Sequence, residues 1–156
     1  MYAGKFVTLA GAEVAAPTGN TNVTRSLLFW YSEPVTHVGA RVAHAASDKA
    51  TFTVGANNGW NIDGSTAKGG KTLELGASLT PSKTFALAAA GYYGDLDVGS
   101  NSRGGTTVGK RSLVDVVATW TATPALTVIV NADWDSQDHI DPLTGQGSAT
   151  WYGVAG

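Results

Sequence analysis

Apolar and polar residues alternate with a period of two along most of this chain, and this pattern restricts the fold more than any other feature. In the segment 71–80, leucine or alanine stands at each odd position from 73 to 79, while Glu74, Gly76 and Ser78 lie between them. Successive side chains of a β-strand point to opposite faces, so the pattern predicts strands with one apolar and one polar face. No helical period is found along the chain, and we therefore expect an all-β fold. The same alternation recurs in 35–44, 50–60, 85–94, 112–122 and 126–135.

The connections between the predicted strands alternate between short and long. Turn residues predict short turns near 47–49, 81–84 and 121–125. Long polar loops are expected at 61–70, 96–110 and 136–148. Short turns at one end of a sheet and long loops at the other are typical of an antiparallel up-and-down meander. We expect a transmembrane β-barrel, or a partial barrel or curved meander sheet, of about seven to nine strands.

Composition excludes several classes of protein. Only 14% of the 156 residues are charged and the net charge is −2, which argues against a nucleic-acid-binding protein because such a protein needs a basic face. The absence of cysteine excludes disulfides and thiolate metal sites. The chain contains no run of about 20 apolar residues, so no transmembrane helix is predicted. No signal peptide is visible at the start, so we expect either a chain that is not exported or one that lacks its original N-terminus.

Strand length and aromatic placement favour a membrane barrel over a soluble sandwich. The predicted strands have about ten residues, the length that a tilted strand needs to cross a bilayer. Large aromatic residues near the strand ends are spaced about eight residues apart, or roughly 20 Å across an apolar band. The alternative is a soluble, exported β-sandwich that binds a ligand through its long loops. The expected aromatic girdle consists of Phe52, Trp60, Phe85, Tyr93, Trp120, Trp134 and Trp151.

Several short motifs along the chain, among them Gly4-Lys5-Phe6, Ser47-Asp48-Lys49 and Trp151-Tyr152-Gly153, together resemble the porin-2 type family of bacterial outer-membrane β-barrels. Two positions depart from the family's pattern, Thr24 where serine is usual and Val35 where phenylalanine is preferred. The motifs are Gly4-Lys5-Phe6 followed by Gly11-Ala12-Glu13-Val14, Thr24-Arg25-Ser26-Leu27-Leu28-Phe29, Glu33-Pro34-Val35-Thr36-His37-Val38-Gly39, Ser47-Asp48-Lys49, Asn58-Gly59-Trp60 and Trp151-Tyr152-Gly153.

The resemblance implies a channel in the bacterial outer membrane that carries small polar solutes or ions by passive diffusion. Its expected partners are outer-membrane lipid and small polar solutes, and a homo-oligomer is compatible with it. Members of this family are considerably longer, so residues 1–156 are expected to be a single β-barrel domain that is truncated at both ends. No enzymatic activity and no cofactor are expected, because no serine nucleophile motif or acid–base pair of carboxylates stands out.

Polar residues on the predicted polar face are the candidates for lining a pore, where charged rings bias ion selectivity. Arg25, with Ser26 to Phe29, is expected to form a segment inside the lumen rather than a spanning strand. The alternative for each charged residue is that it pairs across strands only to satisfy another charge. The candidates are Arg25, His37, Arg41, Glu74, Asp115, Asn131 and Asp133.

Other chemistry-bearing patterns are weak. The residues 65–72 nearly spell a phosphate-binding loop, but Ser65 replaces its first glycine and a strand follows instead of a helix. An acidic run at 133–141 lacks the glycine and terminal glutamate of an EF-hand, so a solvated loop is favoured over a calcium site. That run contains Asp133, Asp135, Asp138 and Asp141. The three histidines, His37, His44 and His139, fall on separate elements, and no metal site is expected.

Overall fold

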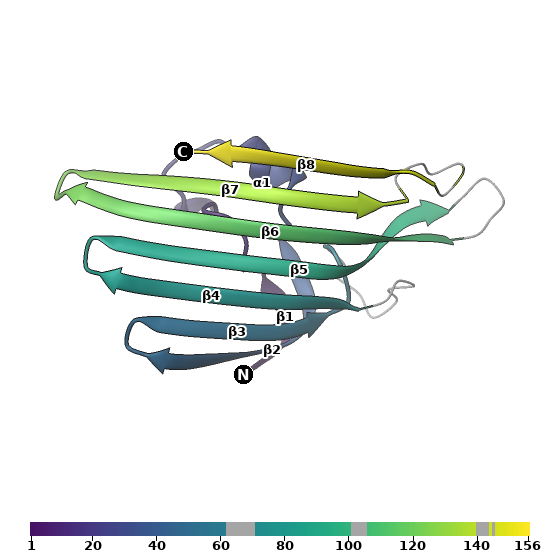
Figure 1. The fold of residues 1–156 in the computed structure, drawn as a ribbon, viewed down its shortest axis with the longest axis horizontal. Helices are drawn as coiled ribbons and strands as arrows, with labels where there is room; N and C mark the ends of the chain where they lie inside the picture. The colour runs from purple at the N-terminus through teal and green to yellow at the C-terminus, as the bar shows by residue number, and fades with distance from the viewer. Residues whose placement is uncertain (62–70, 101–105, 140–143, 145) are drawn as a thin grey trace.

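The computed structural model contains one antiparallel sheet of eight strands and two short helices (Figure 1). It describes residues 1–61, 71–100, 106–139, 144 and 146–156. The helices are the 3₁₀ turn η1 (Pro17–Gly19) and α1 (Leu27–Tyr31). The strands are β1 (Tyr2–Val7), β2 (Thr36–Ser47), β3 (Ala50–Asn57), β4 (Thr72–Ser82), β5 (Phe85–Ser100), β6 (Thr106–Thr123), β7 (Leu126–Asp138) and β8 (Ser148–Ala155).

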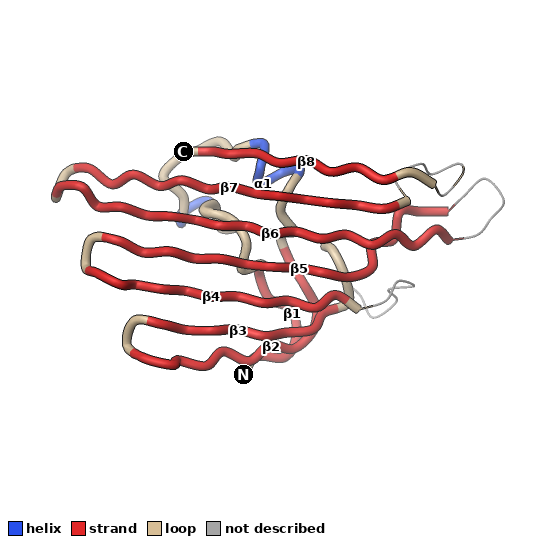
Figure 2. Tube along the Cα trace, viewed as in Figure 1, coloured by secondary structure: helices blue, strands red, loops and turns tan. Residues whose placement is uncertain are grey.

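Each strand pairs with its neighbour in the sequence, so the sheet order is β1 to β8 without a crossover. The all-β prediction, the meander and the strand number are confirmed. The described residues form an open, partial sheet rather than a closed barrel, with β1 and β8 at its two edges (Figure 2). Among these residues no helix has the length and apolar character needed to cross a bilayer.

The three short turns lie together at one end of the sheet, as predicted (Figure 1). The long connections differ from expectation at two places. Strand β5 continues to Ser100 and β6 starts at Thr106, so most of the loop predicted at 96–110 is a paired ladder. Strand β7 likewise runs to Asp138, inside the loop predicted at 136–148. Backbone pairing continues there although the apolar–polar alternation stops, because ladder hydrogen bonds do not depend on side-chain type. The loop predicted at 61–70 lies outside the described residues, except for residue 61.

In a soluble protein the apolar face of a sheet is buried and the polar face is exposed, whereas in this sheet the apolar face is exposed. The apolar face is bare: the exposed fractions are 51% for Val54, 52% for Leu75, 36% for Val116 and 40% for Val130. The polar face is buried along the part of the strands away from the short turns, as at Glu74 and Asp115, whereas Ser78 and Thr127 nearer the turns are exposed. Since a two-layer core would bury the four apolar side chains, the structure does not support the soluble β-sandwich.

Residues 8–35, here called the inner segment, cover the polar face (Figure 1). The segment leaves β1, crosses the sheet and includes α1, whose first turn is capped by Ser26: its Oγ accepts the Phe29 N–H at 3.3 Å. Leu28 packs so closely over Gly153 of β8 that a Cβ there would overlap it. As expected, Arg25 to Phe29 form no strand. The five residues of α1 are too few to show a helical period, which is why this helix was not predicted from the sequence.

Candidate functional site

The polar face beneath the inner segment gathers the ionisable side chains of four strands. Six of the seven pore-lining candidates lie there, all buried, and alternation places them on one face of the sheet. They fall into two groups, one on β2 and β4 and one on β6 and β7. The six are His37, Arg41, Glu74, Asp115, Asn131 and Asp133.

Arg41 and Glu74 form a bidentate ion pair across β3. Nε of Arg41 donates to Oε1 of Glu74 at 2.7 Å, and Nη2 donates to Oε2 at 2.6 Å. Both residues pair in register with Gly55, which lies between them. A Cβ on Gly55 would lie 2.5 Å from Glu74 Oε1, so the glycine leaves room for the ion pair. The guanidinium also lies 4.0 Å from the centre of the Phe6 ring. These charges satisfy each other, which was the alternative interpretation from the sequence.

His37 and Tyr92 link the sheet to the start of the inner segment. Their rings stack with centroids 5.1 Å apart. The Tyr92 hydroxyl accepts the Leu9 N–H at 2.8 Å and lies 3.1 Å from the Thr8 Oγ1. The Nδ1 of His37 lies 3.3 Å from the carbonyl oxygen of Gly59. Tyr92 therefore anchors the segment where it leaves β1.

Arg111 was not predicted as a site residue, yet it holds the end of α1. Its Nη2 bonds Asp135 Oδ1 at 3.1 Å and donates to the carbonyl oxygens of Tyr31 at 3.1 Å and Ser32 at 3.3 Å. The guanidinium lies 3.7 Å from the ring centre of Trp60 and 5.0 Å from that of Trp151. Extending the alternation of 112–122 back by one residue would have placed Arg111 on the polar face.

These contacts correct the predicted aromatic girdle at two positions. Trp60 follows the end of β3, where alternation no longer applies, and it packs toward the polar face. Trp151 pairs with the buried Asp135 and shares its face, whereas the adjacent Tyr152 points outward. The other five predicted aromatics are exposed on or beside the apolar face: Phe52, Phe85, Tyr93, Trp120 and Trp134.

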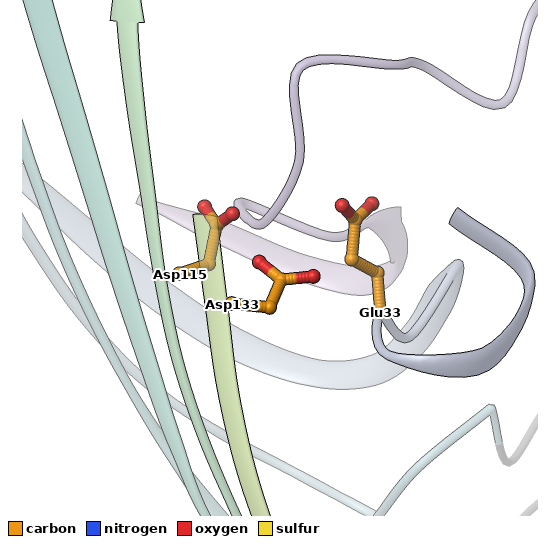
Figure 3. Close-up of side chains that lie close together, drawn as sticks. All are labelled: Glu33, Asp115 and Asp133. Atoms are coloured by element: carbon orange, nitrogen blue, oxygen red, sulfur yellow. The ribbon is translucent and has the colours of Figure 1, made fainter. Parts of the chain in front are cut away.

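Three carboxyl groups converge at the centre of the polar face (Figure 3). Glu33 comes from the inner segment, while Asp115 and Asp133 are direct neighbours on β6 and β7. One oxygen of each lies within 4.8 Å of the other two. The exposed fractions are 4% for Glu33, 0% for Asp115 and 4% for Asp133.

One neutral donor serves the two aspartates of this cluster. Asn131 Nδ2 donates to Asp115 Oδ2 at 2.6 Å and to Asp133 Oδ1 at 3.1 Å. Oδ1 of Asp115, Oδ2 of Asp133 and Oε2 of Glu33 are buried and have no hydrogen-bond partner within the described part of the chain. Burial, followed by the charge of Asp115, raises the pKa of Glu33 to about 8. The carboxyl of Glu33 packs against Gly11, whose φ of +89° favours glycine and where a Cβ would overlap it.

The acidic run at 133–141 is therefore not a solvated loop throughout. Asp133 and Asp135 belong to β7 and are buried, whereas Asp138 is exposed and Asp141 lies outside the described residues. The three histidines stay apart, with His44 and His139 exposed. Glu33 was not predicted as a site residue, because the irregular segment that carries it has no periodicity.

Arg25 lies apart from the other candidates. It sits on the inner segment, where Nη2 donates to the Val14 carbonyl oxygen at 3.0 Å and the guanidinium lies 5.1 Å from the Phe29 ring centre. Together with Glu13 and Asn131, Arg25 lines a cavity of about 260 Å³ beside the end of β8.

Comparison with known families gives one match. Residues 1–156 match the family described as putative beta-barrel porin-2, OmpL-like. No curated protein and no solved structure matches the chain.

Proposed function

The chain belongs to the beta-barrel porin-2, OmpL-like family, and on this basis we propose that it forms part of the wall of an outer-membrane pore through which small polar solutes or ions diffuse passively. The observation that carries the proposal is the bare apolar face opposite a buried polar one. In water, such a face would be an aggregation site, whereas in a bilayer it meets lipid. The function needs no catalytic step.

The strands have the dimensions that this proposal requires. Strand β4 has 11 residues and β7 has 13, and a tilted strand crosses a bilayer with about 9–11. The five outward aromatics are the proposed girdle at the lipid–water interfaces. In lipid, the unpaired edges of β1 and β8 need partner strands. We expect further strands of the barrel or a second copy of the chain to supply them.

The inner segment would narrow the pore from within. It lies against the polar face and is fixed there by Tyr92, Arg111 and Asn131. Arg41 and Arg111 are each paired with a carboxylate, whereas among the described residues the aspartates Asp115 and Asp133 accept hydrogen bonds from the neutral Asn131 and form no ion pair. This excess of carboxylates favours cations over anions near the segment.

Planar-bilayer recording on the full-length protein tests the proposal. We expect single-channel currents with a modest preference for cations. Heat-denatured protein in the same detergent is the control for leakage. A folded, inserted protein that gives no current above this control would contradict an open pore.

A further inference from the structure

Glu33, Asp115 and Asp133 stand in an environment that does not favour three negative charges. All three are buried, and Oε2 of Glu33, Oδ1 of Asp115 and Oδ2 of Asp133 lack hydrogen-bond partners. Asn131 is neutral, so its hydrogen bonds leave the summed charge in place. Burying an ionised carboxylate without a compensating charge is strongly unfavourable. Either protons on these carboxyl groups or a bound cation must therefore offset their charge.

We propose that Glu33, Asp115 and Asp133 bind a divalent cation of the calcium class, and that the bound ion fastens the inner segment to β6 and β7. Glu33 separates this arrangement from an ordinary acidic cluster: it comes from another element, its carboxyl group lies beside the aspartate pair (Figure 3), and its buried Oε2 has no hydrogen-bond partner among the described residues. The site does not depend on the proposed pore function.

The donor set selects the kind of ion. Carboxylate oxygens suit hard cations, and the three residues offer no imidazole or thiolate for a softer metal. Calcium binds oxygen at about 2.3–2.6 Å, so two ligands of one calcium ion can be about 4.8 Å apart. The three oxygens already lie within 4.8 Å of one another. Magnesium binds oxygen at about 2.0–2.1 Å, demands near-octahedral geometry and usually keeps several waters, so a site made only of protein carboxylates suits calcium better.

The position of the site gives the ion a structural role. Asp115 and Asp133 belong to the sheet, whereas Glu33 follows α1 at the end of the inner segment. The ion would therefore join parts of the chain that otherwise meet through hydrogen bonds such as that from the Ala12 N–H to Asn131 Oδ1 at 2.6 Å. Its removal would leave the carboxyl groups to repel one another and would loosen the segment.

Calcium titration of the full chain, folded in detergent micelles and freed of metal with a chelator, tests the site. We expect one ion per chain by calorimetry, and affinity reduced by about tenfold or more in Glu33→Gln and in Asp115→Asn. Asp138→Asn, an exposed carboxylate on β7, is the matched control and should bind like the unmodified protein. Absence of binding, or equal binding by all variants, would overturn the proposal.

A second measurement follows the segment itself and does not require conductance. Trypsin cleavage after Arg25 reports on whether the inner segment is held down. Calcium should slow this cleavage about tenfold or more in the unmodified protein and leave the rate unchanged in Glu33→Gln. A different result would overturn the proposal. If calcium changes the cleavage rate of neither protein, and Glu33→Gln is cleaved as slowly as the unmodified protein, then protons rather than a cation neutralise the cluster.

Discussion

Register decides which charged residues of the polar face become partners. Arg41 and Glu74 meet because both ladders align them with Gly55, and Asp115 meets Asp133 because β6 and β7 pair them directly. Period-two alternation predicted the face of each of these residues, since alternation alone decides it. The pairs could not be predicted, because register depends on turn geometry and on irregularities such as the bulge between Ala45 and Ser47.

Removing one partner of the buried ion pair should be costly. In Arg41→Ala, Glu74 stays buried without its cation, and we expect a loss of about 3–5 kcal/mol in the free energy of unfolding. In a pore, the uncompensated carboxylate should shift the reversal potential toward cations. Denaturant unfolding and bilayer recording measure the two effects, with Lys83→Ala in an exposed turn as control. An unchanged reversal potential would remove Arg41 from the residues that face the ion path.

The two strand glycines Gly55 and Gly91 form a matched pair for a second test. A Cβ at Gly55 would lie 2.5 Å from Glu74 Oε1 and 2.9 Å from Arg41 Cβ, whereas at Gly91 the nearest atom is the Leu113 carbonyl oxygen at 3.9 Å. We expect Gly55→Ala to lower the free energy of unfolding by about 1–3 kcal/mol, because the ion pair must shift. Gly91→Ala should leave it nearly unchanged in the same denaturant titration. Equal effects would mean that the ion pair adapts freely.

At the scale of elements, the positions of the strands could be predicted from the sequence, whereas the structure of the inner segment could not. The strands carry the alternation themselves, but α1 is a single turn whose stability comes from its Ser26 cap and from what Leu28 and Phe29 touch. Tertiary contacts of this kind leave no local periodicity. For the same reason Glu33 was not recognised as a site residue, and Arg111 fell just outside the segment where alternation was recognised.

Arg111 should control how firmly α1 is held. In Arg111→Ala, the carbonyl oxygens of Tyr31 and Ser32 lose their donor and Asp135 loses its counter-charge. We expect faster hydrogen exchange at the Ser32 and Glu33 amides, both of which donate to Leu28, by about tenfold or more. Lys110→Ala, its exposed neighbour on β6, is the matched control and should leave these rates unchanged. Exchange that is equally slow in both variants would show that α1 is fixed by packing alone.

The whole molecule is an open sheet whose faces are reversed relative to those of a soluble protein. Composition and alternation predicted this arrangement, since a low charge content combined with strict alternation leaves every second residue for lipid. The meander order of the strands was also predicted from the sequence. Short turns force pairing only within β2–β3, β4–β5 and β6–β7, and the pairing across the long connections rested on the meander pattern. That residues 1–156 are a truncated single domain stays a prediction.

Substitution of two valines on the apolar face of β6 and β7 tests whether this face of the sheet contacts lipid or water. Val116 lies between the outward aromatics of these strands, whereas Val128 pairs with Trp120 near the turns. In a bilayer, Val116→Lys should cost about 2–4 kcal/mol and Val128→Lys about 0–1 kcal/mol. In water both changes would stay within about 0.5 kcal/mol. Unfolding from lipid vesicles measures the difference, and equal small costs would contradict a lipid-facing sheet.

The neighbour-to-neighbour pairing of the sheet implies an order of events during folding. Each hairpin closes through local contacts, so the wall can grow strand by strand from any of its turns. The inner segment cannot follow that order, because Leu9 bonds Tyr92 and Ala12 bonds Asn131, 83 and 119 positions further along the chain. The part of the described chain that is synthesised among the first is therefore among the last to reach its place, and until β5 and β7 have formed it has nowhere to dock.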